Sequence, residues 1–126
     1  MQSIQSDDAP KAIGPYSQAV VYKDLLFLSG QIAINPKTGT IEANGIEGQT
    51  RQVMSNIQAI LASAGSDLSR VLKCTVFLTD LQDFGAFNTV YGEYYRQPPP
   101  ARTTVQAAKL PRDAKLEIDV VAYRVG

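Results

Sequence analysis

The fold is decided by residues 18–31, which read Gln18-Ala-Val-Val-Tyr-Lys-Asp-Leu-Leu-Phe-Leu-Ser-Gly-Gln31. This stretch is apolar and rich in residues that favour strands, and the turn-forming pair Lys23-Asp24 interrupts it once. It therefore predicts a hairpin of two strands. The segment Asn35-Pro-Lys-Thr-Gly-Thr40 is dense in turn formers and predicts a surface loop that leads out of the hairpin.

Two helices are expected after this loop. Apolar residues recur at helical spacing from Ile46 to Ala64, and Gly65 stands where a C-terminal cap is expected. A second helix is expected to follow an N-cap at Asp80 and to end at the prolines 98–100. Its apolar stripe consists of Phe84, Phe87, Val90, Tyr91 and Tyr94.

Three further strands complete the expected order. Residues 71–79 read as a strand between the helices, 102–106 as a short β-branched strand, and 116–125 as a longer one. The order is ββαβαββ, which predicts an α+β fold with a mixed sheet and both helices on one face. A chain of 126 residues is long enough for one packed core, so residues 1–126 are expected to form a single domain.

The strands predict an oligomer as well. Residues 20–28, 71–78 and 116–125 are apolar on both faces, which is typical of strands covered on both sides. Two helices can cover only one face of the sheet. Because a large exposed apolar face would aggregate, another copy of the chain is the economical cover for the second face.

Charge and hydropathy exclude several classes of protein. Twelve Lys and Arg balance twelve Asp and Glu, so the overall positive charge expected of a nucleic-acid binder is missing. No apolar run approaches the roughly 18 residues that a membrane span needs, and the polar N-terminus does not resemble a targeting signal. We therefore expect a soluble, cytoplasmic protein that binds neither nucleic acid nor membrane.

The residue inventory also limits the chemistry. The chain has no histidine and one cysteine, Cys74, so it has no Ser-His-Asp triad, Cys-His dyad, internal disulfide or histidine-based metal site. Cys74 lies in an expected strand and is interpreted as a buried, inert thiol. Carboxylates, tyrosines, lysines and backbone groups are left to carry any reaction.

Two charged residues occupy unusual positions. Arg102 follows a rigid proline, and its planar guanidinium can hold a carboxylate with two hydrogen bonds. Glu117 lies in an apolar strand, on the face opposite Leu116 and Ile118, where a partly buried carboxylate can hold or activate water. The same spacing also allows Arg102 and Glu117 to form a buried ion pair, with each other or with neighbours.

Two weaker signals lie at the entry and at the end of the first hairpin. Tyr16, in Gly14-Pro-Tyr16, either covers a ligand or packs against the start of the hairpin. Ser29-Gly30 ends a strand where a backbone NH can approach a ligand, although glycine there is also usual in a β-bulge.

Several separated motifs stand in one order along the chain: Gly14–Ala19, Ser29–Ile32, Asn35–Gly39, Val76–Leu81, and Pro100-Ala-Arg102 followed by Leu110-Pro111 and Leu116–Ile118. Together they resemble the RidA (YjgF/YER057c) family over nearly the whole chain. The resemblance implies a chorismate-mutase-like fold, in agreement with the predicted order, and a homotrimer with clefts between its subunits. It implies a cofactor-free and metal-free hydrolytic deaminase. Its substrates would be 2-iminobutanoate and 2-iminopropanoate, which pyridoxal-phosphate dehydratases form from threonine and serine, and its products 2-keto acids and ammonia.

The resemblance also assigns roles to residues. Arg102 would bind the substrate carboxylate, Glu117 would position the attacking water, and Tyr16, Ser29 and Gly30 would line the cleft. Asn88 matches a position that often lines the same pocket, although a polar residue on a helix surface is the alternative interpretation.

Two residues depart from the family pattern. Thr103 stands where serine is common, and Thr104 where some members carry cysteine. Thr103 keeps a hydroxyl group, and Thr104 points to the same face of the strand as Arg102. We therefore expect a changed pocket shape or selectivity and retained activity.

Other classes of function remain open at this stage. A metabolite-binding or regulatory trimer could use the same Arg102 site without turning its ligand over. Glu117 discriminates between the two, because a binding protein does not need it. Chaperone-like and translation-inhibiting activities have also been attached to the family, but the neutral charge gives no reason to prefer them.

Overall fold

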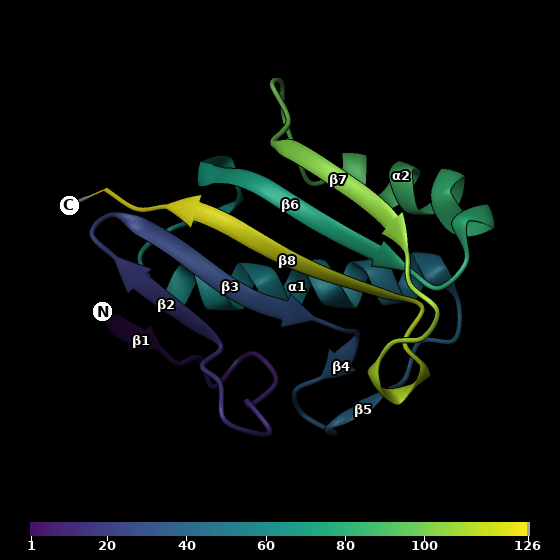
Figure 1. Ribbon diagram of the computed structural model, residues 1–126, viewed down its shortest axis with the longest axis horizontal. Coiled ribbons are helices and arrows are strands. Elements are labelled where there is room, and N and C mark those ends of the chain that lie inside the picture. The colour runs from purple at the N-terminus through teal and green to yellow at the C-terminus, as the bar shows by residue number, and fades with distance from the viewer. Residues whose placement is uncertain (126) are drawn as a thin grey trace.

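The structure is a computed structural model and describes residues 1–125. The described chain forms the following strands and helices: β1 (Gln2–Ile4), β2 (Ala19–Tyr22), β3 (Leu25–Gln31), β4 (Ile34–Asn35), β5 (Thr40–Ile41), α1 (Ile46–Ser63), β6 (Val71–Leu78), α2 (Phe84–Gly92), β7 (Ala101–Gln106) and β8 (Leu116–Tyr123) (Figure 1). Short 3-10 turns lie at Leu68–Arg70, Leu81–Asp83 and Pro111–Asp113.

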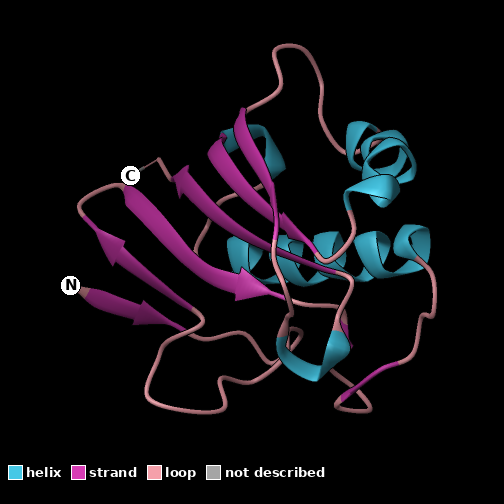
Figure 2. Cartoon of the chain, turned by 45° about the vertical axis from the view of Figure 1, so that its right-hand side comes forward, coloured by secondary structure: helices cyan, strands magenta, loops and turns pink. Residues whose placement is uncertain are grey.

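Six strands form one mixed sheet in the order β1-β2-β3-β8-β6-β7. Neighbouring strands are antiparallel except β6 and β7, which are parallel. Both helices lie on the same side of the sheet (Figure 2). The predicted α+β fold, with a mixed sheet and two helices on one face, is therefore confirmed.

The first hairpin forms where the sequence predicts it. β2 and β3 pair antiparallel around Lys23, whose φ of 54° provides the tight turn. Val21 pairs with Leu26 and both are buried towards the helices, whereas Phe27 on the other face is 42% exposed. The alternation of burial follows from the two-residue period of a strand.

Helix α1 supplies most of the helical part of the core. The following α1 side chains are fully buried: Val53, Met54, Ile57, Ile60 and Leu61. The helix ends at the expected glycine, since Gly65 has a φ of 77°. The N–H of Gly65 donates to the carbonyl of Ala62 at 3.1 Å, and that of Ser66 donates to the carbonyl of Leu61 at 2.9 Å. These two bonds are the Schellman arrangement that satisfies the last carbonyls of a helix.

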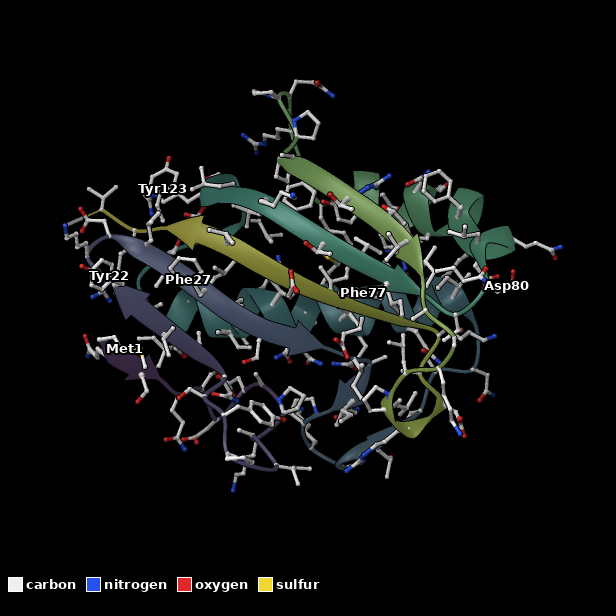
Figure 3. All side chains as sticks on the ribbon, in the orientation of Figure 1. Met1, Tyr22, Phe27, Phe77, Asp80 and Tyr123 are labelled. Carbon is white, nitrogen blue, oxygen red and sulfur yellow. The ribbon has the colours of Figure 1, made fainter. Side chains whose placement is uncertain are left out.

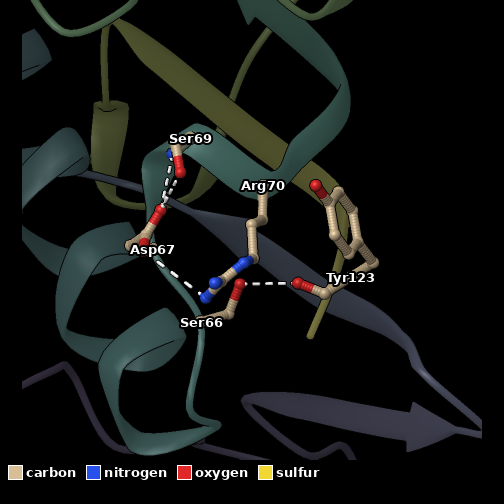
Figure 4. A network of polar contacts seen from close by, with 5 residues as sticks. All are labelled: Ser66, Asp67, Ser69, Arg70 and Tyr123. Atoms are coloured by element: carbon tan, nitrogen blue, oxygen red, sulfur yellow. Dashed lines mark hydrogen bonds and ion pairs between the residues drawn. The ribbon is translucent and has the colours of Figure 1, made fainter. Parts of the chain in front are cut away.

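A polar network joins the end of α1 to the end of β8 (Figure 4). The Ser66 hydroxyl donates to the backbone carbonyl of Tyr123 at 2.7 Å. Asp67 accepts from the backbone N–H and the hydroxyl of Ser69 and forms an ion pair with Arg70 at 3.6 Å. The network fixes the direction in which the chain enters β6.

The elements differ from the sequence predictions in three places. The second helix ends at Gly92, so its predicted end at the prolines 98–100 is wrong; glycine weakens a helix, and residues 93–100 form a loop. Asp80 does act as an N-cap, but for the 3-10 turn before α2, where it accepts from the N–H of Gln82 at 2.9 Å. β1 pairs with β2 at the edge of the sheet and was not expected in the polar N-terminal residues.

The sheet face opposite the helices carries large apolar side chains that are exposed in a single chain. Figure 3 shows Tyr22, Phe27, Phe77 and Tyr123 spread across this face, with α1 behind the strands. Tyr22 is 59% exposed and Tyr123 37% exposed. The two-sided apolar pattern of the strands is therefore present in the structure. The homotrimer that would cover this face stays a prediction.

Candidate functional site

Arg102 lies on β7 against the aromatic side chains of α2. Its guanidinium carbon is 5.0 Å from the ring centroid of Tyr91 and 5.5 Å from those of Phe84 and Phe87. In residues 1–125, Arg102 forms no ion pair, because the three ion pairs there are made by other arginines and lysines. The arginine side chains that donate hydrogen bonds within this range are Arg51, Arg112 and Arg124. The guanidinium therefore keeps its donors available for an anion.

The surroundings of Arg102 contain buried polar atoms that lack a partner. Within the described chain these are Asn88 Oδ1, Tyr91 Oη and Thr104 Oγ1. Thr104 lies two residues after Arg102 and faces the same side of the strand. A cavity of about 490 Å³ opens beside them, between the end of α2 and the proline loop, with Arg102 and Asn88 in its wall. Because buried polar groups normally have hydrogen-bond partners, these three atoms are free to bond a polar group that enters this region, including water.

Cys74 lies beneath this region and is buried, as expected. Its sulfur is 3.5 Å from the hydroxyl of Tyr95. Burial raises the pKa of the Cys74 thiol, and burial likewise raises the pKa of the Tyr91 and Tyr95 hydroxyls. All three groups are therefore neutral at pH 7, so none of them is an anionic partner for Arg102.

Glu117 lies on β8 and extends across the backbone of Gly30. A β-carbon built on Gly30 would be 2.5 Å from Oε2 and 2.8 Å from Cδ of Glu117. A β-bulge creates this approach, because β3 advances three residues from Leu28 to Gln31 while β8 advances two from Val120 to Ile118. Burial, and to a lesser extent Asp119, raise the pKa of the Glu117 carboxyl. Glu117 is thus a half-buried carboxylate with an increased affinity for a proton.

Tyr16, Ser29, Gly30 and Glu117 border one cavity of about 390 Å³. The Tyr16 hydroxyl accepts from the backbone N–H of Ile13 at 3.2 Å, and its side chain remains half-exposed. The Ser29 hydroxyl donates to the carbonyl of Ser17 at 2.6 Å. Ser29 therefore ties the end of β3 to the segment that carries Tyr16.

Buried Gln18 fixes the loop in front of Tyr16. Its Nε2 donates to the carbonyls of Pro10 at 2.7 Å and Ser6 at 3.2 Å, and its Oε1 accepts from the N–H of Ser6 at 2.6 Å. One side chain thus holds the N-terminal segment against β2. Lys11, on the same loop, also borders the cavity.

The predicted site residues therefore form two groups on opposite faces of the sheet. Arg102 pairs with Cys74, and Glu117 pairs with Phe77. Cys74 and Phe77 are three residues apart on β6, so their side chains point to opposite faces. The ion pair between Arg102 and Glu117 that spacing allowed is absent, and one chain cannot bring the two residues together.

Sequence reasoning missed several residues of both groups. Phe84, Phe87 and Tyr91 were interpreted only as the apolar stripe of a helix. Their contact with the Arg102 guanidinium, which the folded chain shows, makes them part of the site. Lys11 carried no signal of its own. Gln18 is a polar residue at the start of an apolar strand, and this position could have suggested a buried hydrogen-bonding role.

Comparison with known proteins identifies the family. A family model described as Endoribonuclease L-PSP matches residues 6–124. Over 119 residues the chain is 44% identical to Reactive Intermediate Deaminase A, chloroplastic, of Arabidopsis thaliana, covering 94% of this chain and 64% of that protein. The chain belongs to the RidA family.

Other proteins match over nearly their whole length. The chain is 50% identical over 121 residues to the RutC family protein PH0854 of Pyrococcus horikoshii, covering 96% of each. The crystal structure of E. coli TdcF with bound serine superposes with a TM-score of 0.94 at 41% identity, covering 99% of this chain and 100% of that one. The RidA-type fold expected from the motifs is confirmed by this match.

The described part of the chain offers neither a metal-ligand cluster nor a membrane-spanning helix. Within residues 1–125, no group of three or more His, Cys, Asp or Glu side chains is placed to hold a metal ion. Across the same residues, neither helix has the length and apolarity needed to cross a membrane.

Proposed function

We propose that the protein is a hydrolytic deaminase that converts 2-imino acids, namely 2-iminobutanoate and 2-iminopropanoate, to 2-keto acids and ammonia without a cofactor. The observation that carries this proposal is Arg102, whose guanidinium has no acidic partner among the described residues and borders a cavity. The planar guanidinium matches a carboxylate, which it can hold with two parallel hydrogen bonds. Support also comes from the Arabidopsis relative, which is named a reactive intermediate deaminase.

The active site is proposed to form between two chains of a homotrimer. The Arg102 and Glu117 groups lie on opposite faces of one sheet, so a site that uses both needs a second chain. The apolar face around Phe27 and Tyr123 supports such an assembly, because burying it against another copy removes it from water. In this arrangement Arg102, Asn88 and Thr104 of one chain face Tyr16, Ser29, Gly30 and Glu117 of the next.

The reaction then needs little more than correct positioning. Arg102 holds the substrate carboxylate, which places the protonated imine carbon next to a water on Glu117. The water oxygen bonds to this carbon while Glu117 takes one water proton, and the C=N bond becomes a single bond. Glu117 then gives this proton to the nitrogen. The C–N bond breaks as the C=O bond forms and the hydroxyl proton passes to Glu117, so that ammonia and the keto acid leave; ammonia or solvent then takes the proton from Glu117. A carboxylate with a raised pKa is suited to take up and return this proton.

A second function is favoured by one observation. The E. coli relative was solved with serine bound, and serine has an amino group in place of an imine. A metabolite-binding or regulatory trimer would use the Arg102 group in the same way but would not need the Glu117 carboxylate.

One assay separates these functions. A threonine dehydratase generates 2-iminobutanoate in the cuvette, and semicarbazide traps the imine that remains. A deaminase speeds 2-ketobutanoate formation and lowers the trapped fraction, and Glu117→Gln binds 2-ketobutanoate like the wild type while losing turnover. If the wild-type protein gives no acceleration at any concentration, the deaminase proposal is wrong. If Glu117→Gln hydrolyses the imine as fast as the wild type does, the role of Glu117 is wrong.

A further inference from the structure

We infer that the rings of Phe84, Phe87 and Tyr91, called here the aromatic cradle, position Arg102 in place of an acidic partner. This inference deepens the proposed function and rests on Arg102 as the carboxylate-binding group. The guanidinium carbon lies 5.0 Å from the Tyr91 centroid and 5.5 Å from those of Phe84 and Phe87. All three distances are within the range in which a ring face attracts a cation.

The cradle solves a problem that an acidic partner would create. An arginine that must be held still is usually fixed by a carboxylate, which then occupies the forked N–H donors. A substrate carboxylate would have to displace that partner. Ring faces attract the positive charge of Arg102 without accepting its N–H donors as a carboxylate does, so the donor edge stays free for a ligand.

The spacing along α2 builds the cradle. Phe84, Phe87 and Tyr91 are separated by three and four residues and therefore lie on one helix face. The rings of Phe87 and Tyr91 are 5.2 Å apart, and those of Tyr91 and Tyr95 are 4.9 Å apart. The inner part of the cradle is thus locked by ring contacts and buried in the core.

Phe84 is the ring that allows a clean test. Phe87 is fully buried and Tyr91 is 5% exposed, so replacing either would disturb the core. Phe84 is 38% exposed and forms the outer wall of the cradle. Phe84→Leu removes the ring and keeps an apolar side chain, Phe84→Tyr keeps the ring, and Leu81→Ala alters an exposed apolar residue that makes no ring contact with Arg102.

The experiment measures the order of the Arg102 side chain and its affinity for a carboxylate. The Arg102 Nε–Hε resonance is assigned by its loss in Arg102→Lys, and its ¹⁵N relaxation is recorded without ligand. The probe for affinity is 2-ketobutanoate. Phe84→Leu is expected to lower the order of the Nε–Hε group and to weaken 2-ketobutanoate binding by about two- to fivefold. In the imine assay it is expected to raise KM by the same factor at unchanged kcat, because Arg102 holds ground state and transition state alike. Phe84→Tyr restores both properties, and Leu81→Ala changes neither.

The outcomes separate this inference from the proposed function. Wild-type order and affinity in Phe84→Leu would overturn the positioning role, and so would an equal loss in Leu81→Ala. If the wild type binds 2-ketobutanoate but shows no turnover, the proposed function is wrong. The positioning role of the cradle is then still tested by comparing the 2-ketobutanoate affinities of the wild type and Phe84→Leu. If the wild type does not bind 2-ketobutanoate, the ¹⁵N relaxation of the Arg102 Nε–Hε group in the ligand-free variants tests the positioning role. Loss of order in Phe84→Leu then supports this role, and wild-type order overturns it.

Discussion

The carboxylate of Glu117 occupies the space that a side chain on residue 30 would need. Only glycine leaves this space empty, since a β-carbon there would be 2.5 Å from Oε2. The backbone of Gly30 does not adopt a positive φ, so its role concerns space and not backbone freedom. Gly30 is therefore a residue that shapes the site through its missing side chain.

Gly30→Ala is expected to displace the Glu117 carboxylate while the fold remains intact. A misplacement of about 1 Å at a reacting group costs on the order of a hundredfold in rate. We therefore expect kcat/KM for imine hydrolysis to fall by about a hundredfold, with little change in thermal stability. Gly85→Ala is the matched control, because a β-carbon on Gly85 meets nothing within 4 Å. Wild-type turnover in Gly30→Ala would show that the position of Glu117 is unimportant.

The raised pKa of Glu117 gives the activity a pH dependence. The carboxylate must be ionised to accept a proton from water, so kcat/KM falls on the acid side with an apparent pKa above the ordinary 4.5. A folded-state pKa above the unfolded value means that stability is lost as pH rises through the folded pKa. Glu117→Gln should therefore unfold at a higher temperature than the wild type at pH 7, and the difference should shrink towards pH 4.5. A rate profile that is flat down to pH 4 would refute this role.

At the scale of the elements, the end of α1 depends on one left-handed residue. Gly65 has a φ of 77°, and its N–H closes one of the two Schellman bonds. Gly65→Ala should lower the free energy of unfolding by about 1 kcal/mol without changing kcat/KM, because an L-residue is strained in this conformation. Gly92→Ala, at a glycine without a positive φ, serves as the control in denaturant unfolding. Equal stability of the two variants would contradict this interpretation.

The elements also show what the sequence could predict. The hairpin at Lys23, the cap at Gly65 and the periodic burial of α1 followed from local patterns, and the structure has them. The edge strand β1 did not, because its pairing with β2 decides it, and the end of α2 was missed although Gly92 offered a local signal for it. Local patterns also placed Glu117 on the face opposite Leu116. They could not show that the guanidinium of Arg102 packs over the aromatic rings of α2, because β7 and α2 come into contact only in the folded chain.

At the scale of the whole molecule, the open sheet face should control assembly. Phe27 is 42% exposed on this face and pairs with Val121 on β8. Phe27→Lys is expected to dissociate the proposed trimer, because a charge cannot be buried there without a partner. Light scattering of Phe27→Lys should report a monomer, whereas Gln58→Lys, on the outer face of α1, should keep the mass of the wild type. A trimer that survives Phe27→Lys would place the subunit contact elsewhere.

The central claim is that Arg102 and Glu117 act from different chains. It is tested most directly by mixing the inactive variants Arg102→Ala and Glu117→Gln, unfolding them together and refolding them as mixed trimers. A site in which Arg102 comes from the Glu117→Gln chain and Glu117 from the Arg102→Ala chain is complete. With random mixing of equal amounts, about a quarter of the sites are complete, so the mixture should regain about a quarter of the wild-type imine hydrolysis. A mixture that forms mixed trimers but stays as inactive as its two parents would contradict the account.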